Sequence, residues 1–173
     1  MKKTVFLLAS LFVMMLATQH VKAQTGAQAS ATANATANVV EVITIDKNAD
    51  LDFGTFASGI IAGTVSMETD GTRYQTGGVV LLTTNAGHPA TFTVHGTNDG
   101  HYSVTLPDDE SVTLTLSGGT ETMTIASFVH SADDGILDAT GQETFKVGGI
   151  LNVAANQPAG IYEGTFDVIV THE

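Results

Sequence analysis

The feature that most limits what this chain can fold into is a two-residue alternation of apolar and polar side chains. It is clearest near the end of the chain, at Tyr162, Gly164, Phe166, Val168 and Val170. The residues between these positions are polar, apart from Ile169. Because successive side chains of a β-strand point to opposite faces, the pattern predicts a strand with one buried face.

The same strand pattern runs through the chain from residue 39 onward. The expected strands are rich in Val, Thr and Ile and cover residues 39–45, 51–56, 64–67, 78–83, 90–95, 102–106, 112–116, 123–129, 146–153 and 162–170. Turn signals rich in Gly, Asn and Asp separate them, and no apolar spacing typical of a helix occurs there. Many short strands separated by turns predict one antiparallel β-sandwich over residues 39–173.

The first 23 residues have the three parts of a signal peptide. Lys2 and Lys3 precede an apolar run over residues 4–17, and a small-x-small site ends at Ala23. The run is shorter than the roughly 20 apolar residues that a membrane-spanning helix needs. We therefore expect cleavage before Gln24 and export to the periplasm, the outer cell surface or the extracellular space.

The composition limits the classes of molecule that this chain can be expected to bind. The chain holds 18 acidic residues, all of them after residue 23, and only Lys47, Arg73 and Lys146 are strong bases there. Phosphate backbones and anionic lipids are bound mainly through Lys and Arg, so neither nucleic acid nor a membrane surface is an expected partner. The chain has no cysteine, which excludes a disulfide and a lipid on cysteine. Its stability must come from its core.

Residues 24–38 have low complexity, with small side chains interspersed with Thr, Ser and Asn. The alanines that share one phase of a strand are Ala29, Ala31, Ala33, Ala35 and Ala37. One interpretation is a flexible leader. The other is an extended arm that donates a strand to another subunit, so that the chain polymerises with itself. The sequence leaves both open.

The segment from Gly149 to Val170 resembles the C-terminal end of domain-of-unknown-function family 4402. Residues 35–40, 51–54, 77–79 and 92–96 fit the rest of that pattern. The resemblance implies an exported bacterial protein with an immunoglobulin-like, pilin-like sandwich, related to fimbrial pilins of the archaic chaperone–usher type and to spore coat protein U. Such pilins usually carry a disulfide, which this chain lacks. The family has no established activity.

Motifs for catalysis or metal binding are weak. Residues 46–52 begin like an EF-hand loop, but Leu51 stands where the loop needs Gly and Ala57 where it needs Glu. We interpret that segment as a polar turn. No nucleophile elbow occurs, and the five histidines after residue 23 match no zinc motif: His88, His95, His101, His130 and His172. We expect no catalytic residue, cofactor or metal.

Two functions follow as expectations. The first is a non-enzymatic structural or adhesive subunit of the cell surface, similar to a fimbrial subunit, with itself or other surface subunits as partners. The second is a stand-alone secreted module whose loops bind carbohydrate or another surface ligand, as β-sandwiches often do. Tryptophan is absent, so the aromatic platforms that sugars stack on are scarce.

Overall fold

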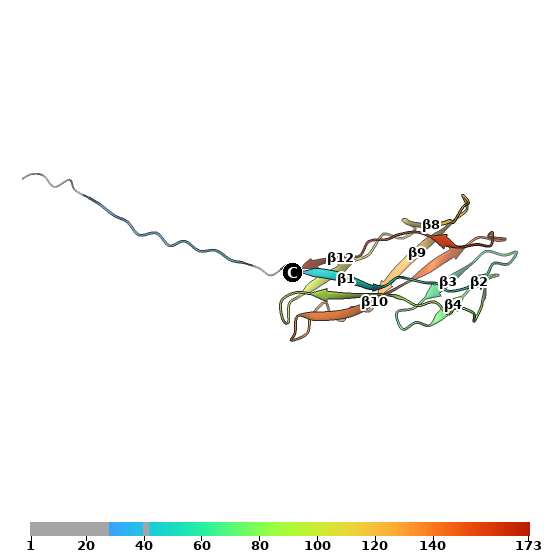
Figure 1. The fold of residues 1–173 in the computed structure, drawn as a ribbon, viewed down its shortest axis with the longest axis horizontal. Helices are drawn as coiled ribbons and strands as arrows, with labels where there is room; N and C mark the ends of the chain where they lie inside the picture. The colour runs from blue at the N-terminus through green and yellow to red at the C-terminus, as the bar shows by residue number, and fades with distance from the viewer. Residues whose placement is uncertain (1–27, 40–41) are drawn as a thin grey trace, which may run out of the picture. The chain divides into compact units, whose positions relative to one another are not determined.

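The computed structural model describes residues 28–39 and 42–173, and the expected signal peptide lies outside these ranges. The described residues contain twelve strands and no helix, so the predicted all-β antiparallel fold is confirmed (Figure 1). Accordingly, the described part holds no helix long and apolar enough to cross a membrane. Residues Val39–Glu173 form one compact unit.

Eight strands form the main sheet. In spatial order they are β1 (Thr44–Ala49), β6 (Ala90–His95), β10 (Gln142–Val153), β9 (Thr122–His130), β8 (Val112–Leu116) and β11 (Tyr162–Glu163), with β3 (Gly63–Met67) beside β10 and β4 (Arg73–Gln75) beside β3. Two small sheets complete the fold. They are β7 (Tyr102–Thr105) with β12 (Ile169–His172), and β2 (Phe56–Ala57) with β5 (Val80–Leu81).

Strand β10 organises the main sheet. Its first half pairs with β6, its second half with β3, and its middle with β9. At Gly148, where one set of partners gives way to the next, a Cβ atom would lie 2.1 Å from the carbonyl oxygen of Met67. Only glycine allows the two backbones to approach this closely.

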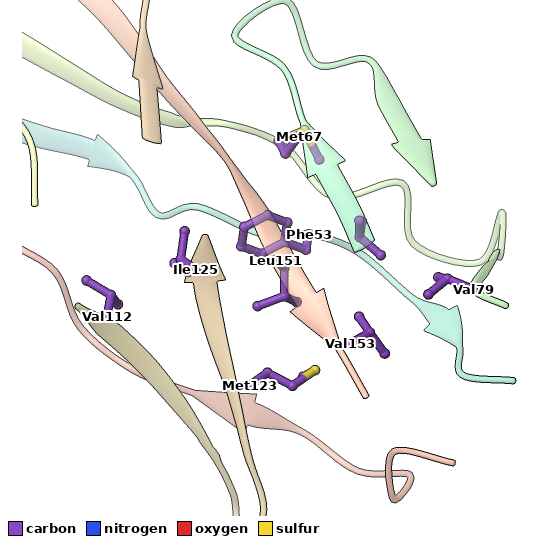
Figure 2. Packing of buried hydrophobic residues seen from close by; sticks show 9 residues of the cluster. Phe53, Met67, Val79, Val112, Met123, Ile125, Leu151 and Val153 are labelled. Carbon is purple, nitrogen blue, oxygen red and sulfur yellow. The ribbon is translucent and has the colours of Figure 1, made fainter. Parts of the chain in front are cut away.

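The buried side chains form two clusters, one under each half of β10. The first holds Phe53, Val65, Met67, Val79, Val112, Met123, Ile125, Leu151 and Val153 (Figure 2). The second holds Ala90, Phe92, Val94, Tyr102, Leu137, Phe145 and Val147. Side chains of β2 and β5 pack on the first cluster, and side chains of β7 and β12 pack on the second. Each small sheet therefore forms the second layer of the sandwich over one half of the main sheet.

The structure corrects several details of the predicted strands. The strands expected at residues 51–56 and 78–83 are replaced by the two-residue strands β2 and β5. The first strand begins at Thr44 and includes Asp46 and Lys47, because its polar side chains lie exposed on an edge strand. The polar turn expected at residues 46–52 is thus partly strand. The strand β4 has no apolar alternation and was not expected. The strand expected at residues 162–170 is broken into β11 and β12, although its alternation of half-buried and exposed side chains is present.

Candidate functional site

The first and last strands of the domain each have one free edge. Within the described residues, β1 pairs with β6 alone and β12 pairs with β7 alone. Ile43 and Ile45 from the first segment, and Val168 and Val170 from the last, all pack against the second core cluster. One core is therefore bordered by two strands that do not pair with each other. An unpaired edge presents backbone donors and acceptors to a further strand.

The last segment also loses its sheet partner part-way along. Its ladder pairing stops at Glu163 on β8 and resumes at Ile169 on β7, which leaves residues 164–168 outside any described ladder. The segment is held instead by side chains: Phe166 is half-buried and its ring centroid lies 4.9 Å from that of Phe128. From residue 165 to residue 168 the side chains still alternate between exposed and half-buried, although residues 164–168 have no backbone partner in a sheet.

A cleft of about 650 Å³ opens between the segment that follows β1 and the segment that precedes β11. Residues 51–58 form one wall and residues 157–162 the other. Phe53, Met123 and Leu151 of the first core cluster also line it, and Figure 2 shows these three side chains close together. The cleft therefore reaches apolar core side chains directly.

The polar groups that line the cleft are already paired with one another. Asn85 donates to Asp52 at 2.9 Å, and the Asp52 carboxylate also accepts the Gly54 N–H at 2.7 Å. On the other wall, Gln157 donates to the Tyr162 hydroxyl, which itself donates to the Pro158 carbonyl, each at 2.9 Å. The lining therefore combines apolar side chains with polar groups held in place by these bonds, as small-molecule sites do.

These features lie in a region with a family match. The model of a domain of unknown function, DUF4402, matches residues 43–172, from the start of the first strand segment to the end of β12. The chain belongs to the DUF4402 family. The match confirms the resemblance seen in the sequence; the further relationship to pilins and spore coat proteins stays a hypothesis. Comparisons with curated proteins and with solved structures gave no match.

The five alanines expected to form a donor strand lie before the DUF4402 region. Ala29, Ala31, Ala33, Ala35 and Ala37 are all exposed, and residues 28–39 form neither helix nor strand. Residues 24–27 of the expected arm lie outside the described ranges. The donor role of these alanines stays a prediction.

The histidines of the DUF4402 region are placed individually. His95 ends β6 and His101 precedes β7, so they flank one turn as the sequence indicated. His95 lies 3.3 Å from the Asp46 carboxylate of the neighbouring β1. Among the described residues, no group of three or more His, Asp or Glu side chains is arranged to hold a metal ion. The free edges and the cleft are the features that sequence reasoning missed, because both depend on which strands pair.

Proposed function

We propose that this DUF4402 chain is an exported, non-enzymatic cell-surface subunit, similar to a fimbrial subunit, that assembles by strand addition. Residues 24–38 of one copy would add as an extended strand along the free edges of the next copy. The observation that carries this proposal is the break in the last strand, where residues 164–168 border a shared core without sheet partners. A donated strand supplies those partners.

The arm has the chemistry that such a strand needs. Its backbone provides donors and acceptors along its length, because residues 24–38 contain no proline. Its alanines would face the core, and its Ser, Thr and Asn side chains would face solvent. A methyl group buries little area at about 25 cal/mol per Å². Backbone hydrogen bonds, each contributing about 0.5–1.5 kcal/mol net, would therefore provide most of the affinity.

Export is part of the proposal and has a direct test. Residues 1–23 would be removed as a signal peptide on the way to the cell surface. N-terminal sequencing of the protein recovered from surface extracts should read from Gln24. A start at Met1 would contradict export by this route.

Assembly is tested on a denaturing gel with unheated and boiled samples of surface extract. Strand-exchanged polymers should give a ladder in the unheated lane that collapses to monomer on boiling. The informative variant is Ala33→Pro with Asn34→Pro, because neighbouring N–H groups of a strand point to opposite partners and proline removes both.

The matched control is Ala33→Ser with Asn34→Ser, which keeps both N–H groups. The proline variant should lose the ladder and the serine variant should keep it. Since these residues are exposed and outside any strand, neither change should unfold the domain. A ladder that persists in the proline variant, or the absence of a ladder in the unchanged protein, would contradict strand addition.

The second candidate function is a stand-alone binding module, favoured by the cleft. Its volume of about 650 Å³ lies within the range of about 300–1,000 Å³ found for small-molecule sites. Phe53, Phe56 and Tyr162 are the aromatic residues on its two walls. A glycan array probed with the mature protein tests the carbohydrate version, and binding that Tyr162→Ala removes would favour this function over assembly.

A further inference from the structure

Exposed aliphatic side chains gather at one end of the domain. Ile60 is 83% exposed, Ile61 64% and Ile161 70%, and Val80 of β5 is also exposed. We call these four residues the apolar tip. The end of the domain that holds β2, β3 and β4 lies opposite the C-terminus and the start of β1 (Figure 1).

The loops of the apolar tip are held by short contacts. The Asn156 N–H donates to the Gly59 carbonyl at 2.7 Å, and the Ser58 hydroxyl donates to the Gln157 carbonyl at 2.9 Å. A Cβ atom on Gly78 would lie only 2.5 Å from the Ile61 carbonyl oxygen, so these backbones are in direct contact. The tip is thus a preformed apolar surface.

The tip is uncharged within a strongly acidic chain. The three stretches that build it, residues 53–67, 74–87 and 147–162, contain no Asp, Glu, Lys or Arg, whereas the whole chain has 18 acidic residues. Glu121 lies in the neighbouring β8–β9 turn. Large exposed apolar patches on soluble proteins mark interaction sites. An uncharged patch is also where another acidic molecule can approach without repulsion.

The opposite end of the domain is acidic. The Asp99 N–H donates to the Asp138 carbonyl there, and the Glu173 N–H donates to the His101 carbonyl. The first strand segment starts at this end, with Val42 77% exposed. Contact between two acidic ends would bring like charges together, whereas contact between an acidic end and the apolar tip would not.

We propose that the apolar tip binds a second copy of this chain head to tail, against Val42 and the start of β1. This inference rests on the proposed subunit function, because the arm of residues 24–38 lies only a few residues before Val42 in the sequence. A neighbour placed in this way can lay its arm along the free edges of the first copy. The contact is heterologous: each copy still offers one tip and one β1 end, so that it propagates into a filament.

Cross-linking between single cysteines tests the contact, because the chain has no cysteine of its own. Copies carrying Ile60→Cys are mixed with copies carrying Val42→Cys and treated with a short bismaleimide. We expect about tenfold more covalent dimer than when Val42→Cys is replaced by the control Val129→Cys, a difference of about 1.4 kcal/mol in contact free energy. Val129 is 44% exposed on β9 and pairs with Gly148 in the middle of β10.

Each outcome separates this inference from the assembly proposal, since covalent dimers survive boiling and strand-exchanged ladders do not. A ladder without the Ile60–Val42 cross-link overturns the head-to-tail contact but keeps strand addition. The cross-link without a ladder supports the contact and contradicts strand addition. Dimers in a sample of Ile60→Cys copies alone would indicate a closed tip-to-tip pair and overturn the proposal. Binding of the tip to uncharged lipid vesicles, without binding to a second copy, would also overturn it.

Discussion

At the scale of single residues, the Arg73 side chain stabilises the fold through hydrogen bonds to the backbone. Its guanidinium donates to the carbonyls of Phe53 at 2.9 Å, Thr55 at 3.3 Å and Leu82 at 2.8 Å. These bonds tie the segment after β1, which forms one wall of the cleft, to the end of β5. A planar fork with several donors can hold three carbonyls at once, which a lysine ammonium on a flexible chain does less well.

We therefore expect both Arg73→Ala and Arg73→Lys to lower the free energy of unfolding by about 1–3 kcal/mol, because the Phe53 carbonyl, in a part-buried bond, loses its donor and two exposed bonds are lost with it. Urea unfolding followed by circular dichroism measures this. Lys47→Ala is the control: Lys47 pairs only with the exposed Asp50, so its loss should change stability by less than about 0.5 kcal/mol. If Arg73→Lys were as stable as the unchanged protein, positive charge rather than the fork would be what matters.

Asp138 provides a residue-scale prediction on pH. The Thr140 hydroxyl, followed by the N–H groups of Gln142 and Thr140, lowers the pKa of this carboxylate below its ordinary value of 3.8. At pH values above the unfolded-state pKa, the lower folded-state pKa stabilises the native state. That stabilisation is lost as the pH falls through the folded-state pKa.

Asp138→Asn should accordingly lower the urea midpoint at pH 7, and the difference from the unchanged protein should shrink as the pH falls below about 4. Asp109→Asn, in the exposed turn before β8, is the matched change of charge. A difference between Asp138→Asn and the unchanged protein that stayed constant down to about pH 2 would show that the carboxylate charge is not what stabilises this turn.

At the scale of elements, β10 joins the two halves of the core. Phe145 and Val147 of this strand lie in the second cluster, and Leu151 and Val153 lie in the first. Because one continuous strand carries side chains of both clusters, a substitution that disrupts one cluster should also destabilise the other. The two halves are expected to unfold as one unit.

Phe145→Ala should cost about 3–5 kcal/mol and Leu151→Ala about 2–5 kcal/mol, since both residues are fully buried and leave cavities. Each variant should still show a single unfolding transition in calorimetry, with the calorimetric and van't Hoff enthalpies equal. Val129→Ala, an exposed position on β9, is the control. Two separate transitions in either variant would contradict the coupling through β10.

At the scale of the whole molecule, the net charge affects both stability and association. The chain carries a formal charge of −12, with 18 acidic residues. Excess charge of one sign destabilises a compact state through self-repulsion and keeps copies apart in solution. Salt screens that repulsion, with a Debye length that falls from about 30 Å at 0.01 M to about 3 Å at 1 M.

The melting temperature should therefore rise with NaCl between about 0.01 M and about 0.5 M, and any ladder on unheated gels should become more intense. Asp108→Asn with Asp109→Asn removes two exposed charges and should reduce the slope. A melting temperature that falls with NaCl would mean that attractive ion pairs outweigh the repulsion.

The sequence alone determined the strands whose side chains alternate against a core. It predicted β3, β6, β8 and most of β9 and β10, because burial of one face leaves a period of two that needs no partner to be recognised. Family membership was also visible in residues 149–170, as the match over residues 43–172 confirms. The inward positions Phe166 and Val168 of the last segment were correctly assigned for the same reason.

Only the tertiary structure decided which backbones pair. β1 lies at Thr44–Ala49 because β6 fixes its register, and β4 exists because β3 is beside it. The break at residues 164–168, the free edges and the cleft depend on partners distant in the chain. The backbone hydrogen bonds of a strand do not depend on the order of its side chains. No local sequence signal therefore marks the residue at which a ladder ends. Alternation therefore specifies which face is buried, whereas the packed fold specifies which edge is left open.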